Sequence, residues 1–269
     1  MSLSQNWKDL MMRRLFRKKI IRQLFFYLAL LFIWQSVCYF KFWPEYIFPS
    51  PLKVINALIS GFADLTFIYA IAVSLKRIVI GYGISIITGT VLGILMYRFS
   101  WVEETVGGLV LAVQTLPSIC WLPLSIIWFG LNERAIIFVV IMGAVFSVTM
   151  AVDTGFKNIP LIYLQAGKNM GAGGFKFLRK VMIPASFPVL VVGLKQGWSF
   201  AWRSLMAGEL LFVSMGLGYL LMAGRELNDM AQVIAVMIVI CSVSIIVDRV
   251  IFGRLEAEVK KRWGFRRKI

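Results

Sequence analysis

Long apolar runs, each close to the length of a membrane-spanning helix, divide most of this chain. A helix needs roughly 20 apolar residues to cross about 30 Å of hydrocarbon. Stretches of suitable length and composition occupy residues 24–40, 78–97, 105–129, 135–152, 189–206 and 233–250. The pattern predicts an all-α polytopic membrane protein with six transmembrane helices.

Between the first two spans, residues 41–67 contain three prolines, which interrupt regular structure. We expect residues 54–59 to form a short helix along the membrane surface, and the second span to extend back toward Ser74. Within that span Gly81, Ser85, Gly89 and Gly93 recur every fourth residue. Small residues at this spacing let another helix approach closely. Packing within the same subunit is the simplest interpretation.

Prolines also interrupt the third span. Pro117 and Pro123 each remove a backbone hydrogen bond and are expected to kink the helix. In lipid, freed carbonyl groups are tolerated only where protein or a water-filled cavity satisfies them. The third span, including Gln114, Pro117 and Ser118, is therefore a candidate for lining a transport path.

Composition agrees with a membrane protein. Hydrophobic residues make up 59% of the 269 residues and charged residues 16%, with mean hydropathy +0.81, which excludes an ordinary water-soluble domain. The net charge of +16 could suggest nucleic acid. However, Lys and Arg gather in the N-terminal arm, around Arg98, in residues 157–184 and in the tail from Arg249. This asymmetry predicts that both termini are cytoplasmic in an inner membrane, and it explains the charge without nucleic acid.

Several chemistries lack the residues that they need. Histidine is absent, and Cys38, Cys120 and Cys241 lie far apart in apolar stretches, so we expect no metal site, disulfide or histidine-based catalysis. The nearest approach to a P-loop, Gly167-Lys168-Asn169, lacks the first glycine and the final hydroxyl residue. We therefore expect no enzyme activity and no cofactor bound by this chain.

The fifth span is unusually polar. Lys195, Trp198 and Trp202 share one face, and Gln196, Ser199 and Arg203 form a neighbouring stripe. A cation at the bilayer centre costs at least about 3 kcal/mol. Two interpretations stay open. The cations either line an anion path, or Lys195 reaches the inner surface while Arg203 reaches outward and pairs with Glu209. The candidate path residues are Gln114, Pro117, Ser118, Lys195, Ser199, Trp202, Arg203 and Glu209.

The longest cytoplasmic connection predicts a compact knob of two short helices. An amphipathic helix over 161–170 follows Pro160, and glycines at 171, 173 and 174 interrupt it. A second helix follows, with Phe175, Leu178 and Val181 on one face, and is expected to stop at Pro184. Gly171 is expected to take a left-handed backbone. Such a knob suits insertion into a groove on a soluble partner.

This loop resembles the signature of permease subunits in binding-protein-dependent ABC importers: Glu-Ala-Ala, three residues, Gly, nine residues, Ile, one residue, Leu-Pro. Gln165, Ala166 and Gly167 take the first places, followed by Gly171, Val181 and Ile183-Pro184. The departures are Gln for Glu, Gly for Ala and two aliphatic exchanges. The resemblance implies that the loop, with Lys168, is the coupling helix that docks onto an ATPase.

Further motifs resemble the sulfonate/nitrate/taurine branch of these permeases. They are Pro49-Ser50-Pro51, Ser74-x-x-Arg77-x-x-x-Gly81, Leu116-Pro117, Leu122-Pro123-Leu124, Trp128-Phe129-Gly130 and Ala207-Gly208-Glu209. The resemblance implies the ABC importer permease (MetI-like) fold. It divides the chain into a basic arm and first helix (1–48), a permease core (49–255) with its coupling loop (157–184), and a basic tail (256–269).

The implied function is transport of a small anionic solute. An aliphatic sulfonate is the favoured substrate, followed by nitrate or taurine. The implied partners are cytoplasmic ABC ATPase subunits that bind ATP and Mg, a periplasmic or lipid-anchored substrate-binding protein, and a second copy of this chain. A thiamine-precursor pyrimidine or bicarbonate is an alternative substrate. An ion-coupled secondary transporter is less favoured, because such proteins usually show internal repeats or acidic relays, and these spans hold almost no carboxylates.

Overall fold

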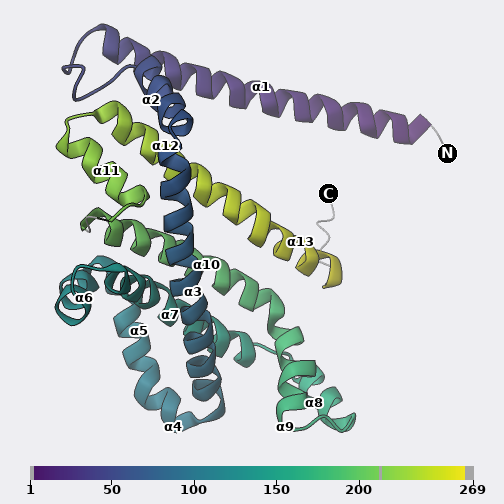
Figure 1. Cartoon of the computed structure of the whole chain (residues 1–269). Coiled ribbons are helices and arrows are strands. Elements are labelled where there is room, and N and C mark those ends of the chain that lie inside the picture. Colours follow the sequence, from purple (N-terminus) through teal and green to yellow (C-terminus); the bar gives the residue numbers. More distant parts are fainter. Residues whose placement is uncertain (1–2, 212–213, 264–269) are drawn as a thin grey trace.

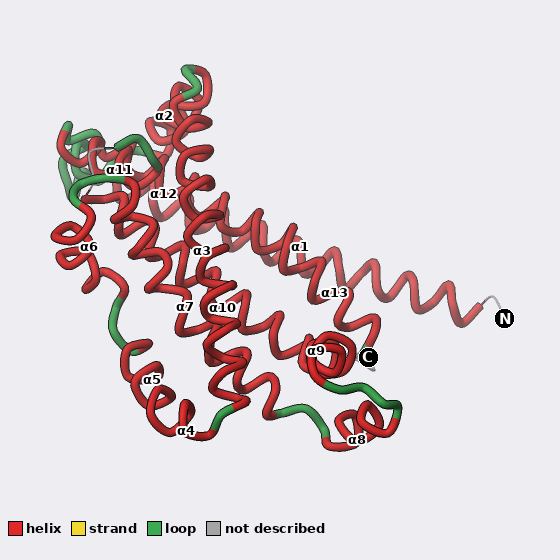
Figure 2. Tube along the Cα trace, turned by 60° about the horizontal axis from the view of Figure 1, so that its bottom comes forward, coloured by secondary structure: helices red, strands yellow, loops and turns green. Residues whose placement is uncertain are grey.

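The computed structural model describes residues 3–211 and 214–263, and every regular element within them is a helix (Figures 1 and 2). The elements are α1 (Leu3–Tyr39), α2 (Pro51–Ala63), α3 (Thr66–Arg98), α4 (Ser100–Val102), α5 (Gly108–Gln114), α6 (Leu122–Phe129), α7 (Glu133–Lys157), α8 (Leu161–Asn169), α9 (Gly174–Phe177), α10 (Ile183–Leu211), α11 (Leu217–Glu226), α12 (Met230–Val247) and α13 (Gly253–Arg262). The side chains of the predicted basic arm up to residue 20, and residues 264–269 of the basic tail, lie outside the described part.

The predicted all-α membrane architecture is confirmed. In the described ranges, five helices are long and apolar enough to cross a membrane, and a bent pair of shorter helices brings the number to six. Four spans are longer than predicted: α3, α7 and α10 each extend past the expected ends, and the sixth continues from Met230 to Val259. α11, between the fifth and sixth spans, was not predicted.

α7 is the central helix of the bundle, packed between α3 and α10. The small residues of α3 face it. A Cβ added at Gly89 would lie 2.8 Å from the carbonyl oxygen of Val145, and Ser85 donates a hydrogen bond to the carbonyl of Ile141 at 3.3 Å. The ridge of small residues therefore serves packing within the subunit, as predicted.

α1 stands apart from this core. In Figures 1 and 2 it runs away from the bundle, and none of the apolar window in its span 21–39 is buried. Its end is joined to the start of α2 by a hydrogen bond from Trp34 Nε1 to the carbonyl of Pro49, at 3.0 Å. A helix that satisfies its own backbone and turns apolar side chains outward is suited to lipid.

The third predicted span is not one continuous helix. The arm from Ser100 to Gln114 and the arm from Ser118 to Phe129 meet at 103°. The break at Pro117 is confirmed, because a proline lacks the N–H and disfavours helical backbone in the residue before it. Pro123 does not kink its helix, since it lies in the first turn of α6, where no hydrogen bond is lost.

The predicted stop at Pro184 is wrong. Helical backbone continues from Gly174 to Leu211. A π-helical turn, Leu178–Met182, changes the hydrogen-bond register directly before α10. Pro184 lies at the second position of α10, two residues after this turn. Phe175 is 74% exposed and does not share the buried face with Val181.

Replacing Gly89 with valine should destabilise the α3–α7 contact by about 1–3 kcal/mol, because the new side chain would overlap the α7 backbone. Thermal unfolding of the purified protein in detergent measures this change. Gly83→Val is the matched control on the same helix, because nothing lies within 4 Å of a Cβ there. Equal melting temperatures for the two variants would contradict the packing interpretation.

Candidate functional site

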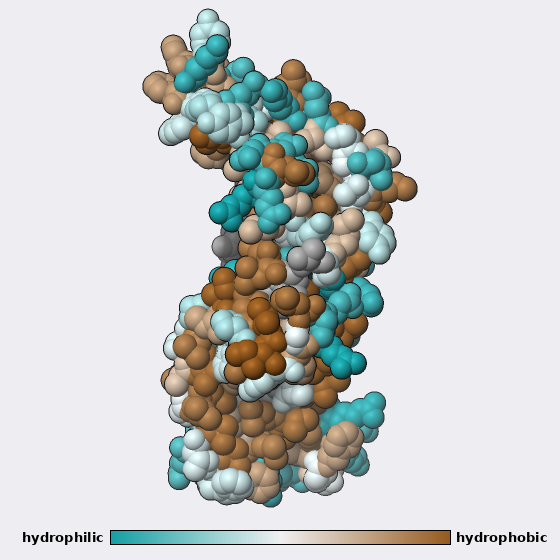
Figure 3. All heavy atoms as spheres, turned by 60° about the vertical axis from the view of Figure 1, so that its left-hand side comes forward, coloured by the Kyte–Doolittle hydropathy of each residue, from teal (hydrophilic) through white to brown (hydrophobic). Residues whose placement is uncertain are grey.

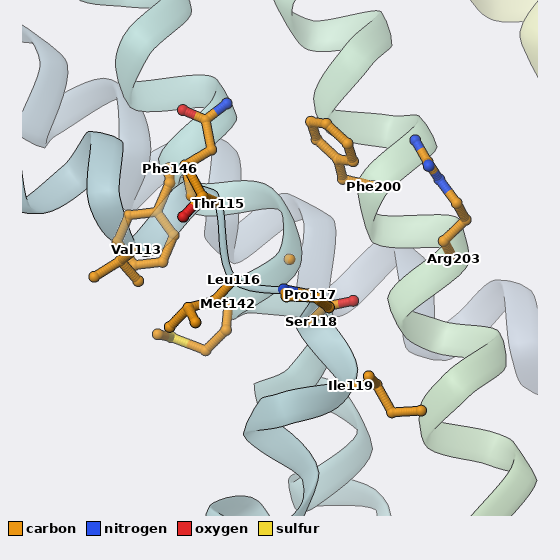
Figure 4. Close-up of a pocket in the computed structure, with 12 residues that line it drawn as sticks. Val113, Thr115, Leu116, Pro117, Ser118, Ile119, Met142, Phe146, Phe200 and Arg203 are labelled. Atoms are coloured by element: carbon orange, nitrogen blue, oxygen red, sulfur yellow. The ribbon is translucent and has the colours of Figure 1, made fainter.

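A cavity of about 320 Å³ opens where the broken third span meets α7 and α10 (Figure 4). One wall is the end of α5 and the following turn, Val113 to Ile119. The opposite wall consists of residues from α7 and α10: Met142, Gly143, Phe146, Phe200 and Arg203. Gln114, Thr115 and Ser118 contribute an amide and two hydroxyl groups. Because Pro117 stops the helix here, polar backbone and side chains face a space instead of lipid.

Arg203 supplies the positive charge of this cavity. Its Nε donates to the carbonyl of Ser199 at 3.2 Å, and its guanidinium carbon lies 4.9 Å from the centre of the Phe200 ring. In Figure 4, Arg203 and Phe200 lie on α10, across from the Pro117–Ser118 turn. Within the described residues Arg203 has no ion pair, so its charge is available to an anion.

The structure brings together half of the predicted path residues. Gln114, Pro117, Ser118 and Arg203 line one cavity although they come from two distant parts of the sequence. Ser199 is exposed one turn before Arg203 on the same helix. The remaining three predicted residues lie elsewhere.

Lys195 does not line the cavity. Its Nζ lies 3.2 Å from Asp248 Oδ2 and 3.0 Å from Glu256 Oε1. These contacts join α10 to the end of α12 and to α13, so the structural interpretation of Lys195 holds. Trp202 is also a packing residue: it is 5% exposed, and its ring stacks on Trp198 with centres 6.3 Å apart.

Glu209 is completely buried, and the predicted pairing with Arg203 is wrong. Its carboxylate accepts hydrogen bonds from Ser74 Oγ at 2.8 and 2.9 Å, from Arg77 Nη1 at 2.9 Å and from the Gly218 N–H at 3.0 Å. Residues six apart on a helix point in different directions, so Arg203 and Glu209 cannot face each other.

The outer charge cluster, as we call Ser74, Arg77, Glu133 and Glu209, fastens four helices. Arg77 is 2% exposed, and its Nη2 also contacts Glu133 Oε1 at 3.2 Å. Ser74 in turn accepts the N–H of Leu217, which begins α11. The cluster thus ties α3, α7, α10 and α11 together near one end of the bundle.

Sequence reasoning missed this cluster, although a signal was available. Arg77 lies at the start of an apolar span, and an intramembrane arginine requires a buried partner. The partner comes from α10, which is 132 residues away in the chain. Glycines make the approach possible, since a Cβ at Gly218 would lie 2.5 Å from the Cβ of Glu209.

The predicted cytoplasmic knob is present with a modified second helix. α8 ends at Asn169, and Gly171 has the expected left-handed backbone, with φ +74°. Gly167 is buried against the following helix, because a Cβ there would lie 2.7 Å from Val181 Cγ2. The backbone at 167 therefore packs directly against Val181, with no room for a further side-chain atom between them.

α8 presents an unusually apolar surface at one end of the molecule (Figure 1). Leu161 and Ile162 are 71% and 70% exposed, and Met170 is 84% exposed. Beside them Ala166, Val181 and Pro184 line an open pocket of about 630 Å³. Gln165, Lys168 and Ile183 are exposed nearby. Exposed apolar side chains on a short projecting helix are typical of a docking surface.

A second apolar surface lies on the face formed by α5 and α6. Figure 3 shows apolar side chains gathered over the lower part of this face. Leu109 and Leu111 of α5 are 61% and 56% exposed, and Ile127 of α6 is 78% exposed. Such a face is suited to lipid or to another apolar protein surface.

The pattern of the family described as "Binding-protein-dependent transport system inner membrane component" matches residues 81–260. A putative ABC transporter permease protein of Methanocaldococcus jannaschii, MJ0413, is 36% identical over 76% of this chain and 78% of its own length. The taurine transport system permease protein TauC of Escherichia coli is 26% identical over 82% of each chain.

The fold is similar to that of a chain in the inward-facing MetNI methionine ABC transporter. The TM-score is 0.58 at 18% sequence identity, over 71% of this chain and 96% of that one. At this identity the similarity concerns the fold alone.

Replacing Glu209 with glutamine should lower the free energy of unfolding by about 3–5 kcal/mol, because it leaves the buried guanidinium of Arg77 without its closest counter-charge. Thermal unfolding in detergent measures the loss. Removing both charges, as Arg77→Met with Glu209→Gln, should recover part of it.

Arg203→Met is the control, since it removes an exposed cation without an ion pair from the same helix. A Glu209→Gln protein as stable as this control would contradict the assigned role of the outer charge cluster.

Proposed function

The chain belongs to the family of inner membrane components of binding-protein-dependent transport systems. We propose that it transports a small anion across the inner membrane and that an aliphatic sulfonate is its favoured substrate. As a permease subunit of an ABC importer it is a transport protein, and its family implies ATPase and binding-protein partners. The observation that carries the substrate proposal is Arg203, which lines the cavity and has no ion pair within the described residues.

The chemistry of the cavity favours an anion with oxygen atoms. Gln114, Thr115 and Ser118 offer an amide and hydroxyl groups opposite Arg203, and the described lining contains no carboxylate. Val113, Phe146 and Phe200 supply apolar surface for a short carbon chain. A sulfonate has three acceptor oxygens on one such chain. The taurine permease among the relatives supports the same class of solute.

Energy for transport would come from ATPase subunits that dock at α8. Those subunits would bind ATP and Mg, and this chain would contribute no ATPase site. The exposed apolar residues of α8 provide the docking surface. The left-handed Gly171 sets the direction in which the chain leaves α8.

A second copy of this chain would complete the transport path. The cavity lies next to the apolar α5–α6 face, which a dimer partner could cover. Both termini are proposed to be cytoplasmic. The ion pairs from Lys195 to α12 and α13 support this, because they link the C-terminal helix to the half of α10 that follows the cytoplasmic loop.

Arg203→Met should reduce uptake of labelled taurine by about ten- to hundredfold in proteoliposomes that contain the permease, its ATPase and its binding protein. This is the loss expected for one hydrogen bond to a charged group. Arg203→Lys should retain most activity. Arg225→Met, which removes an exposed cation from the end of α11 outside the cavity, is the matched control.

Unlabelled nitrate, bicarbonate or an aminopyrimidine can be added as competitors of taurine uptake. A competitor that lowers uptake of labelled taurine is recognised by the same transport system. Strong competition by the pyrimidine, together with full uptake in Arg203→Met, would overturn the assignment to an anion.

Gly171→Val should lower recovery of the ATPase with the affinity-tagged permease, because a β-branched residue at φ +74° costs about 1–3 kcal/mol and redirects the chain after α8. Gly171→Asn should be milder, since asparagine tolerates this backbone. Gly173→Val is the matched control: nothing lies within 4 Å of a Cβ at either glycine, but Gly173 has φ −137°. Equal recovery of the ATPase with all three variants would show that the backbone at Gly171 is not important for docking.

A further inference from the structure

Lys157, the last residue of α7, connects two parts of the chain. α7 leads into the cytoplasmic loop, and the segment that Lys157 contacts leads into α5 and the cavity. Its Nζ lies 2.7 Å from Glu103 Oε1 and 2.7 Å from Asp153 Oδ2. Asp153 lies one turn earlier on α7. Glu103 begins the π-helical turn Glu103–Gly107, which leads directly into α5. We propose that these three residues, the α7–α5 bridge, are positioning residues that transmit movement of α8 to the cavity wall.

On the loop side, the connection is short and constrained. Only residues 158–160 separate Lys157 from α8. Ile159 is 5% exposed, and the N–H of Asn158 donates to the carbonyl of Thr154 at 3.1 Å. Pro160 has a ring-fixed φ. The connection thus leaves little freedom between α8 and Lys157, so a displacement of α8 would act on the end of α7.

On the cavity side, Glu103 begins a continuous helical segment that ends at the cavity. The π-helical turn continues into α5, whose last residue, Gln114, begins the cavity wall. At 1.5 Å per residue, these two residues are about 16 Å apart along the axis. α5 contacts the bundle through the buried Val110, whereas Leu109 and Leu111 are largely exposed. π-helical turns within α-helices are frequently found at functional sites.

The two carboxylates of the bridge differ in burial, and therefore in how easily each contact with Lys157 is broken. Asp153 is 4% exposed, and its Oδ1 has no hydrogen-bond partner within the described residues, so Lys157 is held close to it as a counter-charge. The Lys157 and Glu103 side chains are 37% and 47% exposed. An ion pair in such partial contact with water is made and broken at small cost. The link to Glu103 is thus suited to change between transport states while Lys157 stays beside Asp153.

This inference rests on the proposed function, because it requires that an ATPase moves α8. Cys120, an exposed thiol in the turn Ser118–Trp121 beside the cavity, is a native reporter. In the co-purified permease–ATPase complex, with Cys38 and Cys241 replaced by serine, its rate of labelling by a maleimide is measured without nucleotide and with ATP plus vanadate.

We expect nucleotide to change Cys120 labelling in the parent complex. Glu103→Gln and Lys157→Met should reduce that change about two- to thirtyfold, with ATPase recovery and ATP hydrolysis retained. Lys157→Arg should preserve it. Glu104→Gln is the matched control, because it removes the same charge from the neighbouring exposed residue, for which the described structure shows no ion pair.

A full nucleotide response in both Glu103→Gln and Lys157→Met would overturn the inference. An equal loss in Glu104→Gln would also overturn it, because the effect would then be one of general charge. Failure of the parent permease to recover an ATPase would instead overturn the proposed function, and the α7–α5 bridge with it.

Discussion

The buried ion pair between Arg77 and Glu209 is the interaction on which one half of the bundle depends. A charge in a low-dielectric interior costs several kcal/mol unless it is paired and hydrogen-bonded. Each group therefore restricts where the other can be, although they are 132 residues apart in sequence. Hydrogen bonds from Ser74 and from the N–H of Gly218 complete the site and place the start of α11 over it.

This pairing also determines the electrostatics of the cavity. Because Glu209 is paired with Arg77, Arg203 on another face of α10 has no ion pair among the residues that the structure describes. Lys195, the other cation of the fifth span, is neutralised by Asp248 and Glu256. Lys195 is thus part of the packing of α10 against the C-terminal helices, whereas Arg203 lines the cavity.

Close packing surrounds α7 on its α3 side. Glycines on α3 bring its backbone against α7, whereas α5 ends at the Pro117 break and leaves Leu109 and Leu111 exposed. The cavity forms on the side of α5. The last residue of the same central helix is joined through three residues to α8, so the exposed apolar surface of α8 and the cavity are both attached to α7.

The sequence by itself determined where the spans lie, though not their full lengths, and it determined the proline break, the ridge of small residues and the place of the α8 knob in the chain. These depend on apolar length, on the missing N–H of proline and on the backbone freedom of Gly171, all of which are local properties. It also identified Gln114, Pro117, Ser118 and Arg203 as path candidates. The tertiary structure alone decided which charges pair, because Arg77 meets Glu209 and Lys157 meets Glu103 only after distant helices pack. It likewise decided that helical backbone continues through Pro184, because a π-helical turn changes the register before it. A sequence shows that a buried charge needs a partner, but the choice among several acids depends on helix rotation and distance in the folded chain.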